Sequence, residues 1–353
     1  MRKSRTFAVF GVALVTGLAG AAITPAVAVA APAPTVTTLP FSDPSDVVST
    51  GTRVFVSGGS ESKQIVVTDA AGTVTGTVDG LDGPTDLQLS NDRRTLYVAL
   101  RPAGKIAAVD TGSLALTATF DIGAGTCPSS LAYTGRYLWF GYGCDTWTGD
   151  IGRIDLGRRP TVATKGLADA AFYTAPLLAS ATGNTRVLLA GERQLSPSID
   201  IAYAVGAGGE LTRISATTPE NSGANGQGLA LDPGGTTAFA AGGAPYHVQS
   251  YPVEDMRKTG TAYETGPYPN AVAVSRDGTR VAGGVYAPYD PDVFVFDLNG
   301  TPVTRFELGG SDHTLVSGAL AWAPNGRRLY AVSDDGLPNG APAQLHVLPI
   351  PAA

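Results

Sequence analysis

The 353-residue chain has few charged side chains, which make up 15% of it against about 25% in an average soluble protein. Coiled coils and long-helix proteins need more charge than this, and so do acidic disordered tails. Lys and Arg number 24 and Asp and Glu number 30, so the formal net charge is −6. A nucleic-acid-binding surface needs clustered basic residues, and we therefore exclude nucleic acid as a partner.

Histidine is also scarce. The chain has three, of which His247 and His313 are expected in loops and His346 inside a strand. Two loop histidines cannot build a three-histidine metal site. The sequence also lacks the H-E-x-x-H, G-x-S-x-G, Walker A and EF-hand motifs, each of which would indicate a defined chemistry. No short motif therefore names a reaction.

Glycine and proline, in contrast, are abundant. The chain has 45 Gly and 25 Pro residues, and 43% of it is hydrophobic. Gly and Pro favour turns, and a low charge content with many apolar residues favours a packed core. The composition predicts a turn-rich, all-β protein.

The N-terminus has the pattern of a secretory signal peptide. Basic residues within the first five precede an apolar run over 7–23, and Pro25 and alternating small residues follow up to Ala30. We predict that residues 1–30 are removed and that 31–353 form a single exported domain. No Cys lies near the cleavage site to carry a lipid, and no later stretch reaches the about 18 apolar residues that span a bilayer. A retained membrane anchor is the alternative.

One phrase, two apolar strands around a Gly, Asp or Asn turn, recurs seven times. The turns lie near residues 51, 92, 135, 183, 234, 278 and 326, which are 41, 43, 48, 51, 44 and 48 residues apart. A third apolar strand, often ending on Asp as at Asp69 and Asp297, and a more polar fourth strand follow. A period in the forties is typical of propeller blades. The sequence predicts a seven-bladed β-propeller; a pair of β-sandwiches is the alternative.

The last repeat predicts how the ring closes. It contains three clear strands, 318–323, 328–333 and 344–348, and the chain then ends. A spare strand, 35–39, lies ahead of the first repeat. We predict that this strand joins the last blade as its outer strand, which closes the ring and covers an exposed sheet edge.

Two of the turns resemble those of a known family. Ser275, Asp277 and Gly278 with the strand after them, and the segment 325–332, resemble YVTN-type propeller repeats, and 109–111 resembles their third strand. The chain differs from WD40 repeats because it has no Trp-Asp dipeptide. The resemblance implies a seven-bladed ring of an exported bacterial type. Such families include lactonase-like enzymes and binding proteins, so the fold does not choose a function.

The two cysteines flank the third hairpin. Cys127 and Cys144 lie eight and nine residues from the turn at Gly135, so we expect them to face each other across the first two strands of this blade. Outside the reducing cytoplasm such a pair should be oxidised. The sequence predicts a disulfide, with two free buried thiols as the alternative.

Aromatic residues mark one face of the predicted ring. The loops that lead into each first strand and those that leave each second strand open at the same end of a propeller. We predict that the ligand binds to residues of these loops, namely Trp147, Tyr173, Tyr246, His247, Tyr268, Tyr286, Tyr289 and His313. Aromatic rings with polar tips bury area and keep a hydrogen-bonding group. Local packing against prolines is the alternative.

These features together predict a monomeric, exported binding or interaction module without a transmembrane segment in the mature chain. The acidic balance favours a neutral or cationic partner, or a metal ion, over an anionic polymer. The alternative is an extracytoplasmic lactonase-like hydrolase or lyase that uses the central funnel, and no catalytic residue is identified for it. Asp290 and Asp292 form a candidate Ca²⁺ site because Ca²⁺ prefers oxygen ligands; solvated turn carboxylates are the other interpretation.

Overall fold

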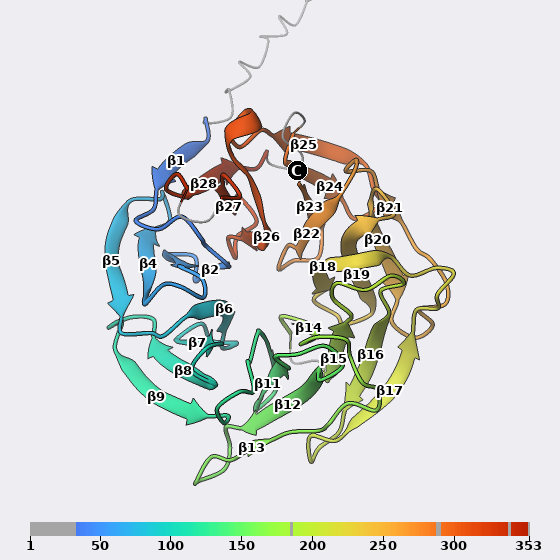
Figure 1. The fold of residues 1–353 in the computed structure, drawn as a ribbon. Coiled ribbons are helices and arrows are strands. Elements are labelled where there is room, and N and C mark those ends of the chain that lie inside the picture. The colour runs from blue at the N-terminus through green and yellow to red at the C-terminus, as the bar shows by residue number, and fades with distance from the viewer. Residues whose placement is uncertain (1–32, 184–185, 287–290, 338–339, 352–353) are drawn as a thin grey trace, which may run out of the picture. The chain divides into compact units, whose positions relative to one another are not determined.

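The computed structural model describes residues 33–183, 186–286, 291–337 and 340–351. Within these ranges, 28 strands form seven four-stranded antiparallel sheets. Figure 1 shows the sheets arranged radially as blades around one axis, with the first strand of each blade nearest the axis. The predicted all-β, seven-bladed propeller is confirmed.

Blades 1 to 4 follow the chain outward from the axis. Blade 1 contains β2 (Val47–Ser49), β3 (Arg53–Ser57), β4 (Gln64–Asp69) and β5 (Val74–Asp79). Blade 2 contains β6 (Pro84–Leu89), β7 (Thr95–Leu100), β8 (Lys105–Asp110) and β9 (Leu116–Asp121). Blade 3 contains β10 (Ser130–Thr134), β11 (Tyr137–Tyr142), β12 (Asp150–Asp155) and β13 (Ala163–Thr164). Blade 4 contains β14 (Leu177–Ser180), β15 (Val187–Gly191), β16 (Asp200–Val205) and β17 (Leu211–Ala216).

Blades 5 and 6 repeat this order, and blade 7 takes its outer strand from the other end of the chain. Blade 5 contains β18 (Ala224–Leu231), β19 (Thr237–Ala244), β20 (Val248–Pro252) and β21 (Ala262–Tyr263). Blade 6 contains β22 (Pro269–Val274), β23 (Arg280–Val285), β24 (Val293–Asp297) and β25 (Pro302–Phe306). Blade 7 contains β26 (Thr314–Trp322), β27 (Arg328–Asp334), β28 (Gln344–Pro349) and β1 (Thr35–Thr38), and the short 3₁₀ helix η1 (Gly310–Asp312) precedes it.

The ring closes as the sequence predicts. Strand β1 pairs antiparallel with β28, with Thr35 opposite Val347 and Thr38 opposite Gln344. Leu39, the next residue, is buried against apolar side chains of blades 1 and 7. The first and last parts of the described chain therefore share one sheet, which covers the edge of β28.

The hydrophobic core lies between the blades. Among the described residues, seven clusters of buried apolar side chains each join two adjacent blades. In β3, Val54 and Val56 pack toward blade 7, whereas Phe55 packs toward blade 2. Because side chains alternate between the two sides of a strand, a sheet covered on both sides needs continuous apolar runs. This requirement explains the recurring apolar second strands.

Side-chain hydrogen bonds stabilise the recurring turn between the first and second strands. In blade 6 the Ser275 hydroxyl donates to Asp277 Oδ1 at 2.6 Å and accepts from the Arg280 N–H at 2.9 Å. Gly278 closes this turn with a φ of 72°, a left-handed conformation that glycine adopts without strain. Blade 2 repeats the contact, since the Ser90 hydroxyl donates to Asp92 Oδ1 at 2.6 Å. The same chemistry therefore builds the same turn in different blades.

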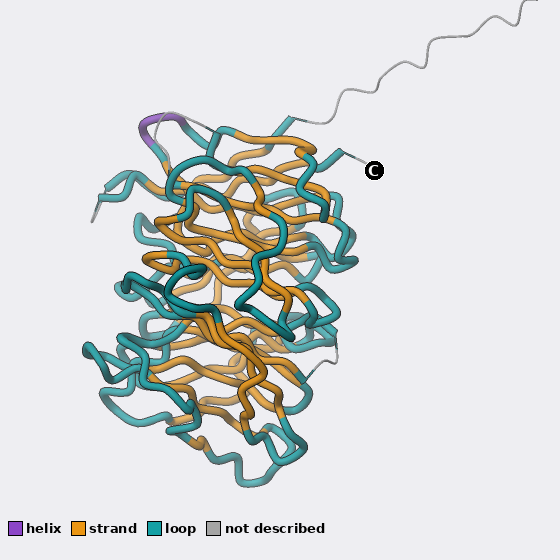
Figure 2. The backbone as a smooth tube through the Cα atoms, turned by 90° about the vertical axis from the view of Figure 1, so that its right-hand side faces the viewer, coloured by secondary structure: helices purple, strands orange, loops and turns teal. Residues whose placement is uncertain are grey.

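Loops gather on two opposite faces of the strand layers (Figure 2). We call the face with the hairpin turns between first and second strands the turn face. The funnel face is the opposite one, where loops lead into the first strands and leave the second strands. Cys127 and Cys144 lie in two such funnel-face loops and form a disulfide, as predicted. The predicted signal peptide, 1–30, lies outside the described residues, within which no helix is long and apolar enough to cross a membrane.

Candidate functional site

A cavity of about 480 Å³ opens at the centre of the funnel face. Polar side chains from different blades form much of its wall, because each blade begins its innermost strand or ends its second strand here. These side chains include Asp46, Ser60, Thr85, Asp86, Arg101, Ser129, Thr174, Arg193, Gln194 and Gln227.

Two of the three wall carboxyls, Asp46 and Asp86, connect neighbouring blades, whereas the third, Asp43, is exposed. Asp46 Oδ1 accepts the N–H of Val47 at 2.7 Å, and its Oδ2 accepts the N–H of Leu87 in blade 2 at 2.8 Å. Asp86 Oδ2 in turn accepts the N–H of Leu131 in blade 3 at 2.7 Å. Both carboxyls are thus held in place by backbone donors from the first strands.

Burial changes the acidity of these carboxyls. It raises the pKa of Asp46, with a further contribution from the nearby Asp86 charge. It also raises the pKa of Asp86 to about 7, against the lowering effects of the Leu131 N–H and the Arg193 charge. Desolvation disfavours a carboxylate more than it disfavours a neutral carboxyl. Asp46 and Asp86 therefore contribute less negative charge to the funnel at neutral pH than two fully ionised carboxylates would.

Arg193 faces these carboxyls without a partner. It follows β15, is half-buried in the cavity wall, and its guanidinium forms no hydrogen bond or ion pair with the described residues. Burial and the like charge of Arg101 lower its pKa, while Asp86 raises it. Arg101 itself donates from Nε to the Ser129 hydroxyl at 3.1 Å. The funnel thus contains two arginine side chains with unused donors.

Trp147 and Tyr173, two of the predicted ligand residues, form a pair beside the funnel. Their rings meet edge to face at 5.4 Å, and the Trp147 N–H donates to the Tyr173 carbonyl at 2.6 Å. The Tyr173 N–H donates to Glu192 Oε1 at 2.9 Å. Glu192 precedes Arg193 and Tyr173 precedes the wall residue Thr174, so this pair and the funnel share two loops.

Three predicted tyrosines form a second group on the loops of blades 5 and 6. The rings of Tyr246 and Tyr268 meet at 5.5 Å, and the Tyr286 N–H donates to the Tyr268 carbonyl at 3.0 Å. The exposed fractions of Tyr246, Tyr268 and Tyr286 are 53%, 53% and 54%, and that of Trp147 is 62%. No other aromatic side chain in the described part of the chain is this exposed. All four exposed aromatics lie on the funnel face.

The remaining predicted residues have no ring contact with these groups. His247 Nε2 is 3.0 Å from Gln249 Oε1, and His313 Nε2 is 3.4 Å from the Pro342 carbonyl oxygen. Tyr289 lies outside the described residues. The seven predicted residues that are described all belong to funnel-face loops, but none of them forms part of the cavity wall. The structure brings them together in pairs and triplets around the funnel.

The candidate calcium residues are placed as follows. Asp290 lies outside the described residues. Asp292 is buried, and its Oδ2 accepts the Leu308 N–H at 2.8 Å. Burial and the neighbouring Glu307 raise the pKa of Asp292 to about 7. No group of three or more His, Cys, Asp or Glu residues in the described chain is arranged to hold a metal ion, and the calcium site stays a prediction.

The funnel wall was missed by sequence reasoning, although a signal for it exists. Asp46, Asp86 and Ser130 each stand at the start of an apolar first strand, and Arg101 and Arg193 stand just after second strands. Asp86 and Ser130 occupy equivalent positions in blades 2 and 3, since each accepts a backbone N–H from the first strand of the next blade. Since these residues lie in different blades, only the ring brings them together.

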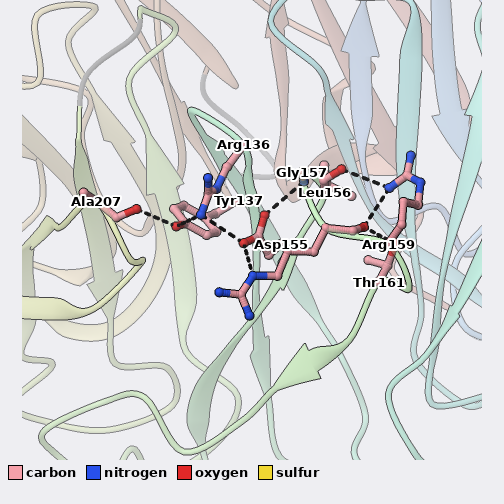
Figure 3. Close-up of polar contacts among 9 residues, drawn as sticks. Arg136, Tyr137, Asp155, Leu156, Gly157, Arg159, Thr161 and Ala207 are labelled. Atoms are coloured by element: carbon pink, nitrogen blue, oxygen red, sulfur yellow. Dashed lines mark hydrogen bonds and ion pairs between the residues drawn. The ribbon is translucent and has the colours of Figure 1, made fainter.

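Polar groups on the turn face satisfy one another instead. Asp155 forms ion pairs with Arg136 at 3.1 Å and with Arg158 at 3.3 Å (Figure 3). Arg136 also donates to the Tyr137 hydroxyl at 2.9 Å, and this hydroxyl donates to the Ala207 carbonyl of blade 4 at 2.8 Å. These contacts tie two turns of blade 3 to the next blade.

Comparison with known proteins identifies the fold. No protein-family model and no curated protein sequence matches this chain. Among solved structures, it is similar to a chain in the crystal structure of the mitotic checkpoint complex, with a TM-score of 0.69 and 14% identity, over 98% of this chain and 99% of that one. At this identity the likeness shows a shared propeller fold.

Proposed function

We propose that this protein is an exported, monomeric propeller of the YVTN type that binds a ligand or partner on its funnel face. The observation that carries the proposal is that all four exposed aromatics of the described chain lie on this face, next to a 480 Å³ cavity. Loops on a rigid scaffold are common binding sites, and exposed Trp and Tyr residues are common anchors in interfaces.

The export part of the proposal rests on two features. Residues 1–30 have the pattern of a signal peptide. The Cys127–Cys144 disulfide is compatible with an oxidising compartment outside the cytoplasm. Edman sequencing of the secreted protein tests cleavage after Ala30, and an intact N-terminus on the mature protein would contradict it.

The binding part is tested by an array of cell-surface glycans and peptides, probed with the mature protein and its variants. The double variant Tyr246→Ala/Tyr286→Ala should weaken the binding that the array detects by about 1–4 kcal/mol if both rings are anchors. Leu298→Ala, which removes an exposed apolar side chain on the turn face, is the matched control. Equal binding by wild type and the tyrosine variant, with a loss in Leu298→Ala, would contradict this site.

One observation favours a second candidate, a lactonase-like hydrolase or lyase. Asp86 lies in the funnel with a pKa raised to about 7, next to Arg193, and perturbed carboxyls in clefts are common in active sites. Against this, Asp86 already binds a backbone N–H of the next blade. Turnover of a panel of lactones that is lost in Asp86→Asn would favour the enzyme over the binding module.

A further inference from the structure

The funnel has a local charge that differs from that of the whole chain. Arg101 and Arg193 reach its wall from the ends of the second strands of blades 2 and 4. Arginine keeps its charge at every physiological pH. The nearest wall carboxyls, Asp46 and Asp86, each accept backbone N–H bonds from the first strands, so part of their hydrogen-bonding capacity is used. Arg193 makes no hydrogen bond with the described residues, and Arg101 uses only its Nε, in the bond to Ser129.

Arg193 is the key group. Its half-buried guanidinium has lost part of its hydration, yet it makes no hydrogen bond or ion pair with the described residues. Partial burial of a cation without a hydrogen-bond partner is unfavourable in free energy. An anionic ligand that pairs with the guanidinium would offset this cost. Two neighbouring arginines repel each other, and this repulsion is also relieved by an anion placed between them.

The position of Arg193 is held by its neighbours. Glu192 Oε1 accepts the Tyr173 N–H at 2.9 Å, which ties the loop before Arg193 to the loop before β14. On the other side, Arg101 Nε donates to the Ser129 hydroxyl, and this hydroxyl donates to the Cys127 carbonyl at 2.8 Å. The disulfide at Cys127 fixes this second loop. The Arg101 side chain and the backbone loop that carries Arg193 are thus held before a ligand arrives, which lowers the entropy lost on binding.

The rest of the wall indicates what the anion is attached to. Hydroxyl and amide groups surround the arginines, supplied by Ser60, Thr85, Ser129, Thr174, Gln194 and Gln227. Such groups donate to and accept from hydroxyls. The cavity volume, about 480 Å³, suits a small organic molecule and lies within the usual range for ligand pockets.

We propose that the funnel binds a small, hydroxylated organic carboxylate, such as a sugar acid, whose carboxylate pairs with Arg193 and Arg101. The planar guanidinium matches a carboxylate in a two-bonded geometry. The proposal rests on the proposed function, since it takes the funnel face as the ligand-binding face. An anionic ligand differs from the neutral or cationic partner that the net charge of the chain favours. The charges of the cavity wall, and not the net charge of the chain, determine which ion the cavity binds.

The test is isothermal titration of the mature protein at pH 7 with glucuronate, gluconate and citrate, and with glucose as the uncharged match. At least one acid should bind saturably, and glucose should not. Arg193→Gln should weaken this binding about tenfold or more, and added salt should weaken it further. Arg276→Gln, which removes an arginine from the cavity wall on the turn face, is the control with the same charge change.

Two further variants guard against a folding defect. Arg101→Gln changes an exposed side chain at the rim and should also weaken acid binding. Arg193→Lys keeps the charge but loses the two-bonded geometry, so its affinity should lie between wild type and Arg193→Gln. Each variant is accepted only if its melting temperature matches the parent. Failure of all three acids to bind below about 10 mM, or equal losses in Arg193→Gln and Arg276→Gln, would overturn the inference.

The outcome also separates this inference from the proposed function. If array binding depends on Tyr246 and Tyr286 but no acid binds, the funnel-face function stands and the carboxylate inference is wrong. If the acids bind in an Arg193-dependent way, the inference stands whichever partner the tyrosines contact. If neither the acids nor the array compounds bind, both fail.

Discussion

The two faces of this propeller use their polar side chains differently. On the turn face, side chains bond to one another within a turn or between adjacent turns of one blade, as Ser275 does with Asp277 and as Asp155 does with Arg136 and Arg158 (Figure 3). On the funnel face, Asp46 and Asp86 bond to the next blade, and Arg193 has no partner among the described residues. Arginine side chains without a hydrogen bond or ion pair to the described residues occur on both faces, as at Arg193 and at Arg93 of the turn face.

The difference between the faces separates residues that stabilise the fold from residues that are free to vary. The first lie in the turns, and the second lie at the starts of the first strands on the funnel face. The turn contacts recur in blades 2 and 6 because each blade must reverse its chain in the same way. The equivalent funnel positions carry Asp in blade 2, Ser in blade 3 and Leu in blade 4. Such variation is compatible with the fold because these positions lie at the start of strands whose apolar residues form the core.

Deletion of residues 31–40 should have the largest effect, because it removes the closure on which both faces depend. The variant loses β1 and the buried Leu39, and it exposes the edge of β28. We expect aggregation or a large fall in melting temperature, measured by calorimetry and light scattering. A soluble variant that melts within a degree or two of the parent would show that the ring does not need β1.

Removal of the disulfide should affect the funnel face more than the turn face. Cys127→Ser/Cys144→Ser opens a loop with a sequence separation of 17, which should cost at most about 3 kcal/mol of unfolding free energy. Hydrogen exchange should increase in the loops around Ser129 and change little in the turn at Asp277. An equal increase in hydrogen exchange in all seven blades would contradict a local stabilising effect of the disulfide.

Two substitutions compare the hydrogen bonds of the faces directly. Ser130→Ala leaves the Leu178 N–H without its buried acceptor and should cost about 1–3 kcal/mol. Asp277→Ala removes the acceptor of two exposed bonds from Thr279, which water replaces, and of the part-buried bond from the Ser275 hydroxyl, and should cost about 1 kcal/mol. Urea denaturation measures both, and a larger loss in Asp277→Ala would reverse the comparison.

The smallest expected effect is a pH dependence of the stability of the folded protein, which comes from buried carboxyls in the funnel and the core. Burial raises the pKa of Asp86, Asp200 and Asp292 to about 7, so the folded protein keeps protons that the unfolded chain releases above about pH 4. Their stabilisation is present at low pH and is lost as the pH rises through about 7. Burial lowers the pKa of His346 to about 4, which opposes this trend below about pH 6.5.

We therefore expect a higher melting temperature at pH 5.5 than at pH 7.5. Asp86→Asn keeps an acceptor for the Leu131 N–H but cannot ionise, and should reduce the difference by about 1–2 °C, the effect of about 1 kcal/mol in a domain of this size. Asp277→Asn is the turn-face control, because hydrogen bonds from Ser275 and Thr279 lower the pKa of that carboxyl. If the melting temperature of Asp86→Asn changed with pH as much as that of the wild type, Asp86 would not contribute to the pH dependence of stability.

The fold was predictable because its signals are local and repeated. Each turn lies within about six residues, and the continuous apolar run of Val54, Phe55 and Val56 is typical of a strand covered on both sides. The disulfide was predictable for the same reason, since Cys127 and Cys144 flank one hairpin. The aromatic loops were predictable as a set on one face, because loop direction follows from strand order.

By itself, the sequence determined the number of blades, the turns, the closing strand and the face that carries the exposed aromatics. Only the tertiary structure decided which side chains meet at the axis. Asp46, Asp86 and Arg193 lie in three different blades, and none has a distinctive neighbour in its own segment. The physical reason is that turns and strand alternation depend on neighbours along the chain, whereas the wall and charge of the funnel depend on how the blades are arranged around it.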